Sequence, residues 1–436
     1  MAAERRSRCN IKTSKGAGMN KAEKIIYDFV KANPRMKNAI RDIYQGLFSL
    51  VPVNQEVYND SLINRQGYFF GFHDKSPWCG DDSILLANKF SIPNREINTG
   101  DTVEVGVFKG EGYREFVPLA KTNSFNWQQG CNSQWVGQKK EIIFNSYDGK
   151  KVISILVDTE GKELKRYELP VAAVSHGGEV ALSYNFNRLA VYAKGYGYEN
   201  GKDEEENVMV PANQGLSIFN LNSGESRKLF SVADIAAMMP DQSMENSFHY
   251  FTHCLFSPSE KRFVFYHRWI RDMNFVRTRM FSCDLDGGNL FLFPATGMVS
   301  HIGWKDDKHI MAYCNTPKFG AGYTLFEDGS NEYNLVGKES FTSDGHPSFS
   351  PVDNRWFITD TYPNRFRLSS LMLYDCHDRK KYDLAKLKQP LQFKNELRCD
   401  LHPRWNRAGT MICFDSAHTG TRSLCTLNIE DLVKSR

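Results

Sequence analysis

Short apolar runs alternate with polar, turn-rich segments from about residue 66 to the C-terminus, in an order that recurs seven times. Each repeat opens with a histidine or another polar residue, continues through an aromatic residue and a turn, and then carries an apolar run typical of a β-strand. The repeats begin 45 to 77 residues apart, which suits a four-stranded propeller blade with inserted loops. They start at His73, Cys131, His176, His253, His301, His346 and His402.

This repeat predicts an all-β fold, a seven-bladed β-propeller over residues 51–436. The last repeat has room for only three strands, so we expect a strand within about residues 50–72 to complete its blade and cover the exposed edge. The second strands are predicted at Ile84–Ala87, Ile142–Phe144, Leu189–Tyr192, Phe263–Tyr266, Ile310–Tyr313, Trp356–Thr359 and Met411–Phe414.

A different pattern occupies the N-terminus. Residues 1–18 are rich in Arg, Lys, Ser and Gly without periodicity and are predicted to be disordered. Residues 19–50 carry apolar side chains at helical spacing, interrupted at Pro34, and predict a short helical extension. We expect this extension to pack on the main domain, and a helix that binds a membrane surface or a partner is the alternative.

Composition narrows the class of protein. With 41% hydrophobic and 13% aromatic residues, the 436-residue chain can bury a large core. A formal net charge of +4 without a dense basic run argues against a nucleic-acid partner, and no apolar stretch is long enough to span a membrane. The ten cysteines form no CxxC pair and lie mostly in apolar runs, so we expect reduced thiols in a cytoplasmic protein. The oligomeric state is left open by the sequence.

Equivalent positions of the blades lie on one ring about a propeller axis. Six of the eleven histidines open repeats and are expected on that ring, at the entrances to the innermost strands. The alternative is that a recurrent histidine caps each inner strand by hydrogen bonding. Loops on the same face carry further cations, including Arg268, Arg365 and His418, which suit a carboxylated or sulfated ligand, although ordinary solvated loop charge is also compatible.

Two local motifs add candidate chemistry. Trp127 beside Gln128 and Gln129 combines an aromatic plane with two amides, as in sugar-binding sites, and a buried structural tryptophan is equally compatible. Asp400 and His402 are two residues apart, so an extended strand would point both side chains toward one ion or one substrate. No phosphate-binding glycine loop, HExxH or GxSxG motif occurs, which argues against nucleotide hydrolysis and serine-hydrolase chemistry.

Residues 245–432 resemble oligogalacturonate lyase, a cytoplasmic seven-bladed propeller enzyme that cleaves short uronic-acid chains by β-elimination with a divalent metal, usually taken as manganese. The resemblance rests on THCLFSP at 252–258, SHIGW at 300–304 and the late His-Pro pair at 402–403. It implies that His253 is the base and that His301 and His402 bind the metal. Asp400 stands where that family has a histidine, and Arg268 replaces an acidic residue. The N-terminal half looks like a broader group of bacterial propellers linked to acidic polysaccharides, which includes ulvan lyases.

The resulting hypothesis is a lyase that cleaves an acidic, uronate-containing glycan by metal-assisted β-elimination, with His253, Arg268 and Tyr198 as catalytic residues. Tyr196 is an alternative to Tyr198 for assisting the leaving group. The metal is assigned to His301, Asp400 and His402, with manganese first and zinc or calcium as alternatives. The alternative function is a non-catalytic propeller that binds glycan or protein in surface polysaccharide metabolism. Substrate binding is assigned to His73, Trp127, Gln128, Gln129, His176, Arg188, His346, Arg365 and His418.

Overall fold

The computed structural model describes residues 46, 48, 49, 51–271 and 275–434. The chain divides into two units, Met1–Pro52 and Val53–Arg436. The predicted disordered segment, 1–18, lies outside the described residues, and so does nearly all of the predicted helical extension, 19–50, of which residues 46, 48 and 49 are helical. The second unit carries the whole β-structure.

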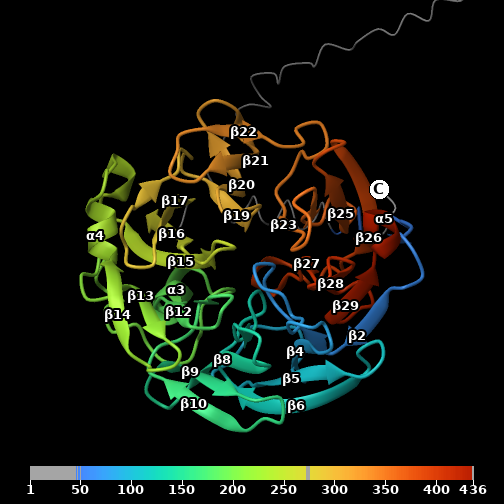
Figure 1. The fold of residues 1–436 in the computed structure, drawn as a ribbon, viewed down its shortest axis with the longest axis horizontal. Coiled ribbons are helices and arrows are strands. Elements are labelled where there is room, and N and C mark those ends of the chain that lie inside the picture. Colours follow the sequence, from blue (N-terminus) through green and yellow to red (C-terminus); the bar gives the residue numbers. More distant parts are fainter. Residues whose placement is uncertain (1–45, 47, 50, 272–274, 435–436) are drawn as a thin grey trace, which may run out of the picture. The chain divides into compact units, whose positions relative to one another are not determined.

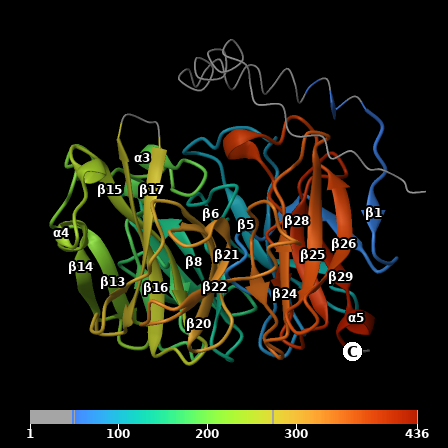
Figure 2. The same cartoon turned by 90° about the horizontal axis from the view of Figure 1, so that it is seen from above.

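This second unit is a seven-bladed β-propeller, as the repeat predicts (Figure 1). Each blade is an antiparallel sheet whose first strand lies nearest the axis, and the strands run along the axis in the side view (Figure 2). Blade one contains β3 (Tyr68–Phe69), β4 (Leu85–Lys89), β5 (Val103–Lys109) and β6 (Glu115–Thr122). Blade two contains β7 (Gln134–Val136), β8 (Glu141–Tyr147), β9 (Val152–Val157) and β10 (Glu163–Tyr167). Blade three contains β11 (Ala173–Val174), β12 (Val180–Ser183), β13 (Gly215–Asn220) and β14 (Ser226–Ser231).

The later blades follow the same order. Blade four contains β15 (Phe248–Phe256), β16 (Arg262–Arg271), β17 (Phe275–Asp284) and β18 (Phe291–Leu292). Blade five contains β19 (Val299–Trp304), β20 (His309–Thr316), β21 (Gly320–Glu327) and β22 (Tyr333–Leu335). Blade six contains β23 (Ser348–Phe349), β24 (Trp356–Asp360), β25 (Leu368–Asp375) and β26 (Lys380–Lys388). Blade seven contains β27 (Arg404–Trp405), β28 (Met411–Ser416) and β29 (Ser423–Asn428).

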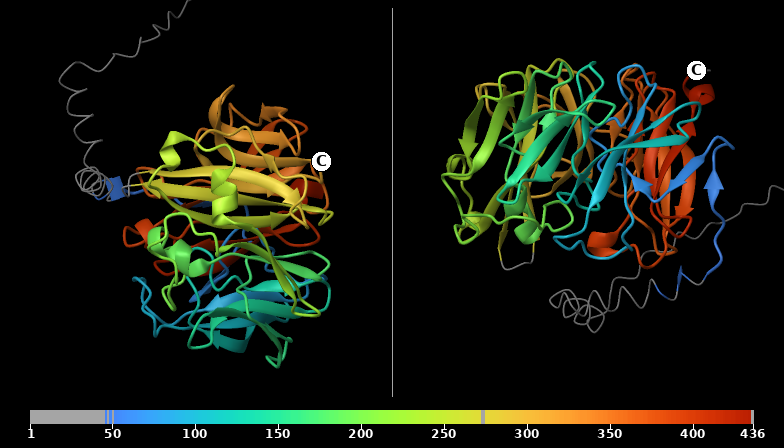
Figure 3. Two further views of the ribbon diagram at one scale, coloured as in Figure 1. Left: turned by 90° about the vertical axis from the view of Figure 1, so that its left-hand side faces the viewer. Right: turned by 90° about the horizontal axis from the view of Figure 1, so that it is seen from below.

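The two ends of the propeller chain join at blade seven. Strand β2 (Ile63–Gln66) pairs antiparallel with β29, so the predicted closing strand from the N-terminal side is confirmed (Figure 3). Strand β1 (Glu56–Val57) adds a fifth strand to blade six by pairing with β26, which the repeat did not predict. Both strands occupy sheet edges that would otherwise expose unpaired backbone groups.

Blade three departs from the predicted pattern. The segment Leu189–Tyr192, predicted as a strand, belongs to helix α3 (Phe186–Tyr192), and β12 is the second strand instead. The helix begins here because the Asn185 side chain accepts hydrogen bonds from the backbone N–H groups of Asn187 and Arg188. The other short helices are α4 (Val232–Ala237), α5 (Glu430–Lys434) and the 3-10 turns η1 (Gln242–Met244) and η2 (Asn395–Leu397).

The aromatic residue of the repeat joins neighbouring blades. The indole N–H of Trp135 donates to the carbonyl of Pro77 at 2.8 Å, that of Trp304 to Leu255 at 3.2 Å, and that of Trp405 to Ser348 at 2.9 Å. Each bond reaches back to the preceding blade, so a buried tryptophan is satisfied while two sheets are held side by side.

Two general expectations bear on the described part of the chain. All nine of its cysteines are free, and eight of them are buried. No helix within it combines the length and the apolar character that crossing a membrane requires.

Candidate active site at the propeller axis

Five of the six repeat-opening histidines come together at the axis. His73, His253, His301, His346 and His402 belong to five different blades, and each is at most 6% exposed. The ring centres of His301 and His346 lie 3.9 Å apart, and those of His346 and His402 lie 4.3 Å apart. Phe72 packs among them, at 4.9 Å from both His253 and His402. We call these five residues the axial histidine group.

His176 does not belong to this group, which corrects the predicted position. Strand β11 ends at Val174, and His176 follows it, exposed, in the turn closed by the hydrogen bond from Gly178 N–H to Ser175. Two glycines after the histidine allow this tight turn, because Gly178 has a φ of +75°. His176 therefore follows its inner strand, whereas His346 and His402 precede theirs and His253 and His301 lie within theirs.

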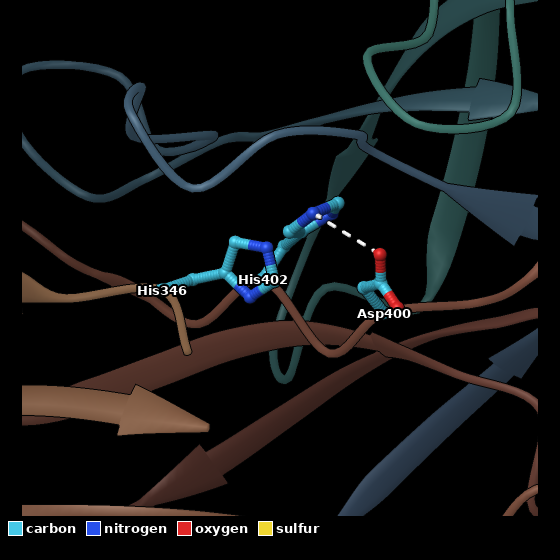
Figure 4. A group of neighbouring side chains, drawn as sticks. All are labelled: His346, Asp400 and His402. Carbon is cyan, nitrogen blue, oxygen red and sulfur yellow. Dashed lines mark ion pairs between the residues drawn. The ribbon is translucent and has the colours of Figure 1, made fainter. Parts of the chain in front are cut away.

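His346, Asp400 and His402 form a group that could hold a metal ion (Figure 4). Their candidate ligand atoms all lie within 4.8 Å of one another, and His402 Nε2 is 4.0 Å from an Asp400 oxygen. His346 Nε2, His402 Nε2 and Asp400 Oδ1 are buried without a hydrogen-bond partner. Buried polar atoms rarely lack a hydrogen-bond partner in proteins. Two imidazole nitrogens and a carboxylate oxygen suit a divalent manganese or zinc ion, so the residues fit the metal that was predicted.

The ligand set differs in one member from the predicted set. Asp400 and His402 are in the group, whereas the third position is taken by His346, to which the sequence assigned substrate binding. His301 lies beside His346 and places its Nδ1 3.1 Å from Asp344. The role of His301 as a ligand stays a prediction.

Asp360 holds the two candidate ligand histidines in place. This buried carboxylate, at the end of β24, accepts hydrogen bonds from the His346 backbone N–H, the His346 Nδ1–H at 2.7 Å and the His402 backbone N–H at 3.1 Å. The Nδ1–H bond fixes the tautomer and leaves Nε2 of His346 as the free acceptor. Burial favours the neutral ring, but the Asp360 charge outweighs it and raises the pKa of His346.

Asp360 was not predicted, because it lies far along the chain from His402. A related signal is present, however: Asp344-Gly-His346-Pro and Asp400-Leu-His402-Pro repeat one pattern in consecutive blades. This repeated spacing of a carboxylate and an imidazole shows that His346 and His402 are equivalent positions. It could have identified His346 as a candidate metal ligand from the sequence.

Arg398 ties Asp400 to a tyrosine. Its Nε donates to Asp400 at 2.6 Å, and its NH2 donates to the hydroxyl oxygen of Tyr196 at 2.7 Å. Tyr196 in turn lies 5.7 Å from the ring of His253. Asp400 thus uses one oxygen for Arg398 and keeps the other for a ligand.

Tyr198 lies in the core, which corrects its catalytic assignment. It is 1% exposed, stacks on Phe186 at 4.7 Å, and its hydroxyl accepts a hydrogen bond from Asn145 at 2.9 Å. Burial raises its pKa well above the ordinary value. Of the two tyrosines, Tyr196, the alternative, is the one that contacts the axial histidine group.

His253 sits in a β-bulge of β15, with a left-handed φ of +55°. A bulge turns a side chain away from the regular alternation of a strand. Its Nδ1 lies 2.8 Å from the Thr252 hydroxyl. Burial first, and the nearby Arg268 charge second, lower the pKa of His253 well below its usual value, so the ring is neutral and can accept a proton.

Arg268 lines a cavity of about 330 Å³ together with Tyr196, Tyr250, Ser300 and Asp344. Its Nε donates to the Thr278 hydroxyl at 3.1 Å. Tyr196 contacts His253, and Ser300 and Asp344 contact His301, so this cavity adjoins the axial histidine group. We call it the upper cavity.

The remaining predicted substrate-binding residues lie in other surroundings. Trp127 is 3% exposed, donates its indole N–H to Arg95 and packs on Phe69, Phe90 and Phe125, which matches the structural alternative. Gln128 donates to the Arg398 carbonyl, while the side-chain oxygen of Gln129 is buried without a partner.

Arg188 is a structural residue, which corrects its assignment. Its guanidinium donates to Asp203 and to the carbonyls of His249, Glu205, Val208 and Met209. These bonds use its five N–H groups, so none is left for a substrate.

Arg365 and His418 lie in the loops after the second strands of blades six and seven, as predicted. Arg365 is exposed and stands over the Phe366 ring, whereas His418 is half-buried and lies 2.8 Å from the Ser416 hydroxyl.

Comparison with known proteins extends this picture. No family model matches the sequence, and no curated protein matches it. Two solved structures are similar in fold. An oligogalacturonate lyase from Vibrio parahaemolyticus has a TM-score of 0.57 and 11% identity over 88% of this chain and 99% of its own. An oligogalacturonate lyase in complex with manganese has a TM-score of 0.58 and 14% identity over 88% of this chain and 98% of its own. The chain thus has the propeller fold of these lyases over nearly their whole length.

Proposed function

We propose that the protein is a lyase that cleaves an acidic, uronate-containing glycan by metal-assisted β-elimination. The observation that carries this proposal is the axial histidine group with Asp400, where three potential ligand atoms are buried without partners beside a cavity lined by Arg268. The fold shared with oligogalacturonate lyases supports it.

The binding residues can be assigned to two groups. His346, Asp400 and His402 hold a divalent metal, manganese first, and His301 is a further ligand. When bound, such a cation withdraws charge from a substrate carboxylate and so makes the neighbouring C5 proton more acidic. Arg268 faces the upper cavity and binds the carboxylate from the protein side.

Proton transfer falls to His253 and Tyr196. The neutral His253 ring accepts the C5 proton, and the Thr252 hydroxyl orients the ring through Nδ1. Because Arg398 donates to the Tyr196 oxygen, the Tyr196 proton is free to be donated to the leaving glycosidic oxygen. The reaction then forms a C4–C5 double bond while the C4–O bond breaks.

The test is the absorbance near 232 nm that an unsaturated uronate product gives. We expect wild-type protein with manganese to form this product from an oligogalacturonate or another polyuronate, and His253→Ala to lower the rate by ~10²–10⁴-fold. His377→Ala is the matched control, because His377 is an exposed histidine of blade six. Product formation at the wild-type rate by His253→Ala would contradict the assignment of the base.

The alternative is a propeller that only binds the glycan. Binding of an acidic glycan by wild-type protein, without product from any polyuronate, would favour it. Nine free cysteines agree with the reducing cytoplasm that we propose as the location.

A further inference from the structure

A second cavity, of about 480 Å³, lies at the other end of the propeller axis. It is lined by the ends of the inner strands β15, β19, β23 and β27 and by the turns that follow them. The upper cavity is lined by the first residues of β15 and β19, by the end of β16 and by the start of β17. All inner strands of a propeller run in one direction along the axis, so the two cavities are at opposite ends. We call this second one the lower cavity. Its volume falls in the range of small-molecule sites, ~300–1,000 Å³.

Arg407 is an unpaired cation in the wall of the lower cavity. The nearby Asp82 carboxylate is already used, because it accepts bonds from Asn406 Nδ2 and from the backbone N–H groups of Arg407 and Ala408. Arg407 Nε is buried without a hydrogen-bond partner, and no ion pair joins its guanidinium to a residue of the described ranges. Burial lowers the pKa of Arg407. The charge of Asp82 offsets part of the cost of this burial, and an anion in the cavity would also supply the hydrogen-bond partner that Nε lacks.

The other polar groups of the lower cavity divide into donors and acceptors. Lys305 lines it and forms no ion pair within the described part of the chain. Of the acids, Asp306 and Asp307 accept hydrogen bonds from the backbone of His309 and Ser259. Asp74 pairs with Lys75 through one oxygen, while its other oxygen is buried without a partner and is an acceptor for a ligand hydroxyl.

The walls between these groups are aromatic. They are formed by Phe256, Trp304, Phe349 and Trp405, and aromatic side chains of this kind pack on the apolar faces of sugar rings. His176 lies at the rim, where a smaller adjoining cavity is also lined by Arg407. The histidine that the repeat placed at the axis is therefore part of this opposite end.

We propose that the lower cavity is a second ligand site, which binds a hydroxylated ring that carries an oxyanion. Arg407 and Lys305 bind the oxyanion, Asp74 accepts a hydroxyl, and the aromatic walls cover the ring. A sugar acid and a sugar phosphate share this chemistry. The proposal does not depend on the lyase reaction, because none of these residues belongs to the upper cavity or to the metal ligands.

The experiment is calorimetric titration of the full chain with galacturonate and with glucose 6-phosphate, and with neutral galactose as the uncharged probe. We expect at least one charged probe to bind, and galactose to bind at least tenfold more weakly. Arg407→Met should weaken binding of the charged probe at least tenfold, and Arg407→Lys should weaken it less. Arg166→Met, at an exposed arginine of the outer strand β10, should leave this binding unchanged, and Arg268→Met tests whether the probe binds in the upper cavity instead. Tighter binding of galacturonate identifies a carboxylate ligand, and tighter binding of glucose 6-phosphate identifies a phosphorylated one.

A thermal melt separates a ligand-binding role of Arg407 from a structural one. Without ligand, Arg407→Met should melt at or above the wild-type temperature, because a partly buried guanidinium whose Nε lacks a hydrogen-bond partner is replaced by an apolar side chain. The charged probe should raise the melting temperature of wild type and not that of Arg407→Met. The proposal is overturned if neither charged probe binds, if Arg407→Met binds as wild type does, or if only Arg268→Met abolishes binding.

Discussion

Blades four to seven each contribute a histidine to the axial histidine group, either from the inner strand or from two residues before it, whereas blades two and three contribute none. In blade two the equivalent residue is Asn132, which has a positive φ as His253 and His402 have. The thiol of the preceding Cys131 donates to Asn88, and the Cys131 carbonyl accepts from Asn145. In blade three the equivalent residue is Val171, whose N–H also bonds to Asn145. One structural repeat therefore serves chemistry on one side of the axis and packing on the other.

The difference lies in what accompanies each histidine. In blades four and five a hydroxyl residue precedes it, Thr252 and Ser300, and bonds to its Nδ1. In blades six and seven a carboxylate stands two residues earlier, Asp344 and Asp400. A buried imidazole with an oriented Nδ1 presents its other nitrogen, which is what a base or a ligand requires. His253 therefore suits proton transfer, and His346 and His402 suit metal binding.

The largest expected effect concerns the ligands of blades six and seven. His346→Ala and His402→Ala should each lower manganese affinity by more than ~100-fold, beyond the loss typical of a partner that only orients a ligand. The fold should persist, since both rings lie at the axis outside the tryptophan bonds between blades. Metal analysis after dialysis measures this effect.

His301→Ala sharpens the same comparison, because His301 is a predicted ligand that lies outside the group of His346, Asp400 and His402. Metal loss equal to that of His346→Ala would make it a ligand, and retention of metal would leave His346, Asp400 and His402 as the set.

The next effect separates the two tyrosines. Tyr196→Phe should lower kcat by ~10²-fold or more, because it removes the proton that we assign to the leaving group. Tyr198→Phe should leave kcat unchanged and lower the free energy of unfolding by ~0.5–1.5 kcal/mol, because it removes only the bond with Asn145. Product formation at saturating substrate and urea unfolding measure the two effects, and equal kcat losses in both variants would refute the distinction.

These tyrosines also show where sequence reasoning stops. The seven blades were predictable because alternating apolar runs recur with their turns, and the closing strand followed from the incomplete last repeat. Tyr196 and Tyr198 sit in one Gly-Tyr-Gly-Tyr motif, and only the packing on Phe186 decides which one faces the axis. Similarly, the Gly177-Gly178 turn moved His176 to the opposite end. Local pattern predicts elements, whereas the direction of a side chain depends on contacts with distant blades.

A smaller effect is expected for the carboxylate that orients the ligands. Asp360→Asn should lower manganese affinity by ~10–100-fold, because the neutral amide holds the His346 Nδ1–H more weakly and its NH2 group cannot accept from the His402 backbone N–H. Asp306→Asn is the matched control, since Asp306, in the turn between β19 and β20, bonds to the half-exposed His309 and contacts none of the three candidate ligands. Unchanged metal affinity in Asp360→Asn would mean that packing alone orients His346.

The smallest effect concerns a buried histidine pair of blade four that lies outside the axial histidine group. Arg279 donates to Nδ1 of His267 at 3.1 Å, so His267 carries its proton on Nε2 and donates it to His249 at 2.9 Å, and His249 donates to the Met244 carbonyl. This series of hydrogen bonds requires both histidine rings to be neutral. Burial lowers the pKa of both histidines, and the Arg279 charge lowers both further.

The sign of the pH dependence follows from these lowered pKa values. Above the unfolded pKa of about 6.5 neither state is protonated, and the stability from the neutral pair is fully present. As the pH falls below 6.5, the unfolded chain binds protons that the folded pair does not, so the free energy of unfolding drops by up to ~1.4 kcal/mol per pH unit for each proton. Urea unfolding between pH 7.5 and 5.5, in the presence of a chelator, should show this slope. His267→Gln should reduce the slope by about one proton, whereas His377→Gln, at a side chain that is 79% exposed, should not. A slope that His267→Gln leaves unchanged would place the acid sensitivity in the axial histidine group instead, where His73, His253 and His402 also have lowered pKa values.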